Sequence, residues 1–180
     1  MSNWYYLMAQ LPSFSISAGT PLPITEEYFN ELCSRFLDDK TMNLLKDLSL
    51  EPPLKVTSSG SKLVDLWYDW ERTLRIVLAQ IRAAKMHKEF NINLPSTSPE
   101  ILQTARTATG FDSPLEAEEY LYNARLEALQ KFSTLEPFST DALLAYALKL
   151  KMAYRIRKFS EEAGMASYRK IYDTILGETT

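Results

Sequence analysis

The sequence predicts an all-α protein, and three observations carry this prediction. The chain of 180 residues contains only 5 Gly, which suits helices better than a turn-rich β fold. Two segments, at about 62–90 and 140–163, repeat apolar residues at steps of three and four, the spacing of one helix face. Residues that favour helix starts precede most of the predicted segments. We therefore expect a bundle of six or seven helices that includes these two long ones.

The N-terminal residues 4–11 are the exception, because their Trp-Tyr-Tyr run favours a short strand by propensity. A short helix fits nearly as well, and no second convincing strand exists with which this one could pair. We expect a short extended or strand-like arm, followed by a connector over 12–24 that contains Pro and Gly. The whole chain is predicted to be a single helical domain, with 1–60 as a candidate smaller lobe and 61–180 as the main bundle.

The predicted helices in the first half of the chain have readable boundaries. Thr25 caps a helix that runs to about Leu37, a short helix starts at Asp38 or Asp39, and residues 49–60 form a loop with two prolines. Ser61 caps the first long helix. The apolar face of that helix consists of Leu63, Leu66, Trp67, Trp70, Leu74, Val77, Leu78 and Ile81.

The predicted helices in the second half of the chain also have readable boundaries. Ser98 and Ser113 each precede a proline at the first helical position, where its missing N–H costs nothing. Ser139 or Thr140 begins the second long helix, which Gly164 ends or breaks. A last helix over about 165–176 carries Tyr168, Ile171, Tyr172 and Ile175. The sequence leaves open whether Gly164 is a simple helix end or a hinge.

Composition narrows the class of protein. The formal net charge is −3, so the whole molecule has no electrostatic attraction to nucleic acid or anionic lipid. A single Cys excludes an internal disulfide, which fits a reducing compartment. The N-terminus lacks the basic region of a signal peptide, and no apolar run approaches the ~20 residues of a membrane span. We expect a cytoplasmic protein without direct membrane insertion.

Recognisable chemical motifs are missing from the sequence. His87 is the only His, which excludes sites with two His ligands, and no two Gly lie close enough for a phosphate-binding loop. Cys33 with His87 is the one covalent-catalysis option, but Cys33 lies on an apolar helix face, as a core residue does. Glu116, Glu118 and Glu119 could act as paired carboxylates, although a helix start explains them. We expect a non-catalytic protein without cofactor or metal ion.

Two basic clusters remain as candidates for partner binding. Residues 145–172 carry 7 basic and 2 acidic groups, while residues 91–144 carry 3 basic and 8 acidic ones. Solvated helix faces or pairing with the acidic segment 113–136 explain this pattern, and docking on an acidic protein surface is the functional alternative. The candidate partner-binding residues are Arg82, Lys85, Lys88, Lys149, Lys151, Arg155, Arg157 and Lys158.

Four blocks of the sequence follow one another in a recognisable order. They are Trp4–Ala9 with Leu11–Pro12; Trp70–Arg75 with Arg82–Ala83 and Lys85; Ser113–Glu118; and Leu144–Leu150 with Arg155 and Gly164. In this order they resemble a bacterial protein family of unknown biochemical role, whose genes lie inside operons for V-type (A/V-type) ATPases. The resemblance covers nearly the whole chain, and its specificity comes from the order of the blocks.

This resemblance implies association with a rotary ATPase. The two long helices are also similar to those of the funnel-shaped helical component of that machine, known as C or d, which seats the central stalk on the rotor ring. The implied function is a non-catalytic accessory or connector subunit that binds stalk or rotor proteins at the periphery of the membrane. Two alternatives stay open: an unrelated helical scaffold or regulator, and an enzyme that uses carboxylates and Tyr in a helical cleft.

Overall fold

The structure, a computed structural model, describes residues 4–14, 22–90, 92, 96–159 and 161–177, with the backbone alone for residues 4 and 161–163. Within these ranges the chain forms eight helices and no strand, which confirms the predicted all-α fold. The helices are α1 (Trp4–Gln10), α2 (Glu26–Ser34), α3 (Asp39–Asp47), α4 (Lys62–Lys85), α5 (Pro99–Ala108), α6 (Pro114–Phe132), α7 (Thr140–Ile156) and α8 (Glu161–Gly177).

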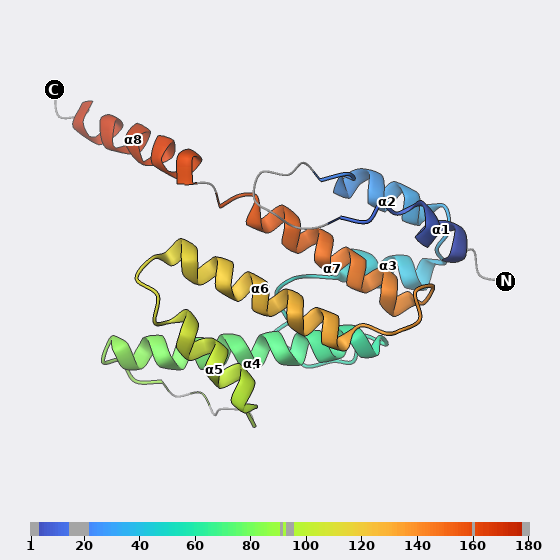
Figure 1. Ribbon diagram of the computed structural model, residues 1–180, viewed down its shortest axis with the longest axis horizontal. Coiled ribbons are helices and arrows are strands. Elements are labelled where there is room, and N and C mark those ends of the chain that lie inside the picture. Colours follow the sequence, from blue (N-terminus) through green and yellow to red (C-terminus); the bar gives the residue numbers. More distant parts are fainter. Residues whose placement is uncertain (1–3, 15–21, 91, 93–95, 160, 178–180) are drawn as a thin grey trace.

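Helix α4 is the central element of the bundle. It packs against α5, α6 and α7, and α6 packs in turn against α7 (Figure 1). Consecutive long helices run in opposite directions, α3 and α2 cover the α7 side, and α8 extends away from the other helices (Figure 1). Helix α4 is the longest helix in the described part of the chain. Its contacts with three neighbouring helices stabilise this length, because most helical stability comes from tertiary packing.

The apolar core has two parts that meet on α4. The larger part joins α1, α2 and α3 to the start of α4, the end of α6 and α7, with Leu7, Phe29, Leu45, Trp67, Leu129 and Leu148 among its buried residues. The smaller part joins the second half of α4 to α5 and the start of α6, with Leu74, Val77, Ile101, Ala105 and Leu121. Trp70 packs against both parts.

The apolar face predicted for α4 is buried except at one edge. Leu66 is 40% exposed, whereas Val64 and Tyr68 on the other edge are buried. The buried face is therefore rotated from Leu66 toward Val64 and Tyr68 relative to the predicted one. The Tyr68 hydroxyl also accepts a hydrogen bond from the Ser49 amide (3.1 Å), which ties the 49–60 loop to α4.

The prediction of a strand-like arm at residues 4–11 is wrong, because Trp4–Gln10 forms helix α1. A lone strand would leave its backbone N–H and C=O groups unpaired, whereas a helix pairs them within one segment. The helical form also brings Leu7 into the core, where it is fully buried. The Tyr146 hydroxyl donates to the Pro12 carbonyl oxygen (2.9 Å), so the chain just after α1 is held against α7.

The predicted capping residues start their helices as expected. In each case the hydroxyl oxygen accepts a hydrogen bond from the backbone N–H three residues later. These caps are Thr25, Ser61, Ser98, Ser113 and Ser139. The Ser61 hydroxyl additionally donates to the Asp141 carboxylate (2.6 Å), so the first turns of α4 and α7 are fixed to each other.

The first long helix ends earlier than predicted, at Lys85 instead of residue 90. His87 adopts a left-handed conformation (φ +53°), and the Lys88 amide donates back to the Ala83 carbonyl oxygen (2.9 Å). The His87 amide donates to the Ala84 carbonyl oxygen (3.1 Å), which completes a Schellman motif. Glycine usually occupies the left-handed position of this motif, so a histidine there gave no readable stop signal.

The second long helix also ends early, at Ile156, and Gly164 neither ends nor breaks a helix. The amides of Lys158 and Phe159 donate to the carbonyl oxygens three residues earlier, which closes a turn after α7. Arg155 already contacts Glu118 in the first turns of α6 (3.5 Å). Such hydrogen bonds over three residues tighten and close the last turn of a helix, and they do so here while the first turns of α6 still lie opposite Lys158 and Phe159.

The left-handed His87 leads to a stability prediction. We expect His87→Gly to raise the free energy of unfolding by about 0.5–1 kcal/mol, because glycine adopts this conformation without the steric cost. Urea unfolding of both proteins measures the difference. Gly60→Ala is the matched comparison, since Gly60 also has a left-handed conformation (φ +85°), and it should lower the free energy of unfolding. An unchanged or lower value for His87→Gly contradicts the argument.

Asp65 in the first turn of α4 leads to a pH prediction. Burial raises its pKa, but hydrogen bonds from the Ser59 amide and the Ser58 hydroxyl (2.7 Å each) outweigh this and hold the pKa below its usual value. A lowered folded-state pKa stabilises the fold above the unfolded-state pKa of about 3.9, and this contribution is lost as the pH falls through the folded-state pKa.

We therefore expect Asp65→Asn to lower the melting temperature at pH 7 and to have a progressively smaller effect as the pH falls below about 4. Thermal unfolding of both proteins at a series of pH values checks this. Asp47→Asn, at an exposed position at the end of α3, is the control and should show no such trend. A constant difference between wild type and Asp65→Asn from pH 7 to pH 3 excludes the proposed role of the carboxylate.

Candidate functional site

A fully buried carboxylate lies at the centre of the bundle. Glu71 on α4 is 0% exposed, and both of its oxygens accept hydrogen bonds from Arg125 on α6 (Nε and Nη2, 3.0 Å each). Its Oε1 atom also accepts a bond from Arg75 Nε (2.8 Å). Two guanidinium groups thus neutralise one carboxylate, and the two parallel bonds from Arg125 fix its orientation as well as its charge.

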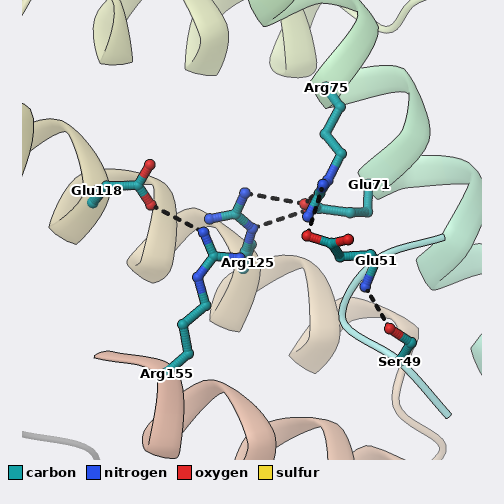
Figure 2. Close-up of polar contacts among 7 residues, drawn as sticks. All are labelled: Ser49, Glu51, Glu71, Arg75, Glu118, Arg125 and Arg155. Carbon is teal, nitrogen blue, oxygen red and sulfur yellow. Dashed lines mark hydrogen bonds and ion pairs between the residues drawn. The ribbon is translucent and has the colours of Figure 1, made fainter. Parts of the chain in front are cut away.

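The buried pair is connected to the surface on one side. Arg75 also lies 3.5 Å from Glu51 in the 49–60 loop, and Figure 2 shows the three side chains in a row. Burial lowers the pKa of Arg75, but the hydrogen bond and the negative charge of Glu71 outweigh it and raise that pKa above its usual value. On the other side, Arg155 from α7 reaches Glu118 next to Arg125 (Figure 2).

Local spacing in the sequence indicates only part of this network. Glu71 and Arg75 lie four positions apart, the spacing of an ion pair on one helix, and they do pair, whereas the bond from Arg125 was missed. A signal existed, because Glu71 lies four residues after Trp67 on the apolar face, and Arg125 lies midway between Leu121 and Leu129. Opposite charges inside the apolar stripes of two neighbouring helices indicate a buried ion pair.

The structure does not bring Cys33 and His87 together. Cys33 is a fully buried core residue of α2, and burial raises the pKa of its thiol to about 12. His87 is exposed beyond the end of α4, at the other end of the bundle from α2 (Figure 1). The interpretation of Cys33 as a small core residue is thereby confirmed, and the two side chains cannot act as a nucleophile and its base.

The three carboxylates at the start of α6 line an open cleft. Glu116, Glu118 and Glu119 face the turn after α7 and the first turns of α8 across a space of about 850 Å³. Lys158 and Phe159 form part of the opposite wall. The Ser113 hydroxyl caps this helix, and the charges of its first turn favour the N-terminal end of the helix dipole. The carboxylates therefore have a structural explanation, with Glu118 engaged by Arg155.

The predicted basic residues of α4 lie at one end of the bundle. Arg82 and Lys85 are exposed in the last turn of the helix, and Lys88 is exposed just beyond it. The Lys85 ammonium donates to the Thr109 carbonyl oxygen at the end of α5. Positive charge there complements the helix dipole, so these residues have a local structural role besides any partner contact.

The basic residues of α7 divide into internal and exposed ones. Lys149 donates to the Phe14 carbonyl oxygen (2.6 Å) and lies 4.8 Å from the centre of the Phe14 ring, so it binds the N-terminal segment. Lys151 is half-buried beside α2, and Arg155 pairs with Glu118. Arg157 and Lys158 are exposed. In the described part of the chain, neither of these two forms an ion pair.

Helix α8 exposes an apolar stripe that contains the apolar residues predicted to lie on the last helix. At about 1.5 Å per residue its 17 residues span roughly 25 Å. Tyr168 and Ile171 are 62% and 61% exposed, and the rings of Tyr168 and Tyr172 stack at 6.1 Å. The large exposed apolar side chains of α8 are Met165, Tyr168, Ile171, Tyr172, Ile175 and Leu176. Their spacing of three and four places them on one face.

The described residues contain neither a membrane-spanning helix nor a cluster of metal ligands. No helix there is both long and apolar enough to cross a membrane. No group of three or more His, Cys, Asp or Glu side chains in the same part of the chain is arranged to hold a metal ion. Comparisons of the chain with protein-family models, with curated proteins and with solved structures found no match. Functional inference therefore depends on the geometry of the site and on the sequence resemblance.

The buried ion pair leads to a stability prediction. We expect Arg125→Met to lower the free energy of unfolding by about 3–5 kcal/mol, because it leaves the Glu71 carboxylate without its bidentate partner. The double substitution Glu71→Leu with Arg125→Met should recover most of this loss, since no charge then remains to be desolvated. Chemical denaturation of the three proteins measures these values.

Arg35→Ala is the control for this experiment, because Arg35 pairs with Glu31 at the surface, where both side chains are about 60% exposed. We expect it to cost less than about 1 kcal/mol. If Arg125→Met costs no more than Arg35→Ala, the buried pair does not organise the contact between α4 and α6.

Proposed function

We propose that this protein is a non-catalytic accessory or connector subunit of a bacterial V-type ATPase and acts through protein–protein contacts. The observation that carries the proposal is the exposed apolar stripe of α8, a helix that extends from the bundle (Figure 1). An exposed, ordered apolar stripe costs free energy in water and favours burial against a partner. The resemblance of the four sequence blocks to the family encoded in V-type ATPase operons supports the choice of partner.

Helix α8 suits docking into a groove of a partner protein. Its apolar side chains recur at the three- and four-residue steps by which an amphipathic helix anchors in such a groove. Two of the anchors, Tyr168 and Tyr172, combine an apolar ring with a polar hydroxyl, a combination that is common at protein interfaces. The proposal therefore expects a partner groove with an apolar floor.

Charge adds a preference for an acidic partner surface. Arg157 and Lys158 are exposed at the base of α8, and Arg169 is exposed on the helix itself. Basic side chains around an apolar stripe accelerate association with an acidic surface and exclude basic ones. Association with stalk or rotor subunits would place the protein in the cytoplasm, peripheral to the membrane through the ATPase.

Co-purification tests the proposal. We expect the tagged chain, expressed with the V-type ATPase subunits of its host, to recover stalk or rotor subunits in stoichiometric amounts. Tyr168→Asp and Ile171→Asp should each weaken this association at least tenfold, because a carboxylate in the stripe cannot enter an apolar groove. Size exclusion with quantitative mass spectrometry, followed by titration of the purified partner, measures both effects.

Two controls accompany these variants. Ala166→Asp introduces the same charge on the opposite face of α8 and should leave the association unchanged. Arg157→Glu with Lys158→Glu should weaken binding and reduce its dependence on salt, whereas Lys62→Glu at the start of α4 should not. An ATPase that assembles fully while this protein elutes alone overturns the proposal and favours an unrelated helical scaffold. Binding that the stripe variants leave intact removes α8 from the interface.

A further inference from the structure

Tyr122 on α6 has a buried hydroxyl without a hydrogen-bond partner among the described residues. The residue is 8% exposed, and its Oη atom is buried. Burial raises the pKa of Tyr122 above its usual value, so the hydroxyl keeps its proton and is a donor as well as an acceptor. Buried hydroxyls in folded proteins are nearly always paired with protein or ordered water, because an unpaired one is costly.

The hydroxyl belongs to a residue that lines a small cavity between α6 and α7. The centre of a water molecule can move within about 10 Å³ of this space. The polar side chains of its wall are Glu118, Tyr122, Arg125 and Arg155, and the apolar ones are Leu50, Met152, Ile156 and Phe159. A site of this size with several polar groups is suited to one water molecule and excludes a larger ligand.

The polar groups of the wall have hydrogen-bonding capacity to spare. Glu118, Tyr122 and Arg125 follow one another at steps of four and three, so they share one face of α6. The 3.5 Å between Glu118 Oε2 and Arg155 Nη2 is longer than the roughly 2.7–2.9 Å of a direct charge-assisted bond. A water molecule that lies beside both groups can accept from one and donate to the other.

We propose that this cavity is a binding site for one ordered water molecule, which joins the Tyr122 hydroxyl to the ion pair of Glu118 and Arg155. The hydroxyl donates to the water oxygen, the water donates to the Glu118 carboxylate, and Arg155 donates to the water. Arg125 lies beside Arg155 and binds Glu71, so the water site adjoins the buried ion pair (Figure 2). This inference concerns the bundle itself and does not depend on the proposed function.

The substitution Tyr122→Phe tests the proposal by the sign of its effect. A hydroxyl without any partner would be better replaced by hydrogen, so the melting temperature would stay the same or rise. A hydroxyl that is bonded to an ordered water loses that bond, and we expect the melting temperature to fall by about 2–4 °C. Tyr154→Phe calibrates the loss of a direct bond, because the Tyr154 hydroxyl donates to the Ile24 carbonyl oxygen (3.0 Å).

Two further measurements identify the water. A high-resolution crystal structure of the full chain should show a water peak within hydrogen-bond distance of Tyr122 Oη and of Glu118 or Arg155. Tyr122→Phe and Glu118→Ala should lower the melting temperature by less in combination than the sum of their separate effects, because both remove contacts to the same water. A missing peak, additive effects, or a Tyr122→Phe protein as stable as wild type each overturns the proposal.

Discussion

The carboxylate of Glu71 constrains how α4 can lie against α6. A charge withdrawn from water is tolerated only where donors surround it, and here Arg125 supplies two of them from the facing helix. The pair separates the larger core, with Trp67 and Leu129, from the smaller one, with Leu74 and Leu121. Sliding α4 by one turn along α6 would break these bonds and bring apolar side chains of one core opposite those of the other. The ion pair therefore selects one register among several that apolar packing alone would permit.

The bundle and its last helix differ in whether their apolar faces are buried. In α4, α6 and α7 the apolar faces are buried against one another, and the basic side chains Lys149 and Arg155 are engaged by internal partners. In α8 the apolar face is exposed, and the basic groups nearby face solvent. In the proposed function, the bundle would be the rigid body that presents α8 to a partner. The division explains why the predicted basic residues do not act as one patch: α7 uses several of them to hold its own neighbours.

Sequence reasoning succeeded where a structure is specified locally. Hydroxyl caps such as Ser61 and Ser113 act on the backbone three residues away, so a short pattern suffices to predict them. It failed at residues 4–11, where the propensity of aromatic residues for strands outweighed the lack of a pairing strand. It failed again at the end of α4, because the left-handed residue is His87 and not a glycine. In the first case the deciding contact is the burial of Leu7 among distant segments, whereas in the second the motif is local and only its usual glycine is absent.

The sequence by itself determined the all-α class and the starts of most helices, because periodicity and capping are properties of short segments. Only the tertiary structure decided that Glu71 and Arg125, 54 positions apart, share a bidentate pair, and that Arg155 of α7 pairs with Glu118 of α6. Only the tertiary structure also decided which apolar stripe is left exposed. The stripes of α4 and α8 both have the spacing of a helix face, and they differ in whether another helix is there to cover them. Burial depends on neighbours brought together by the whole fold, and a local pattern carries no record of them.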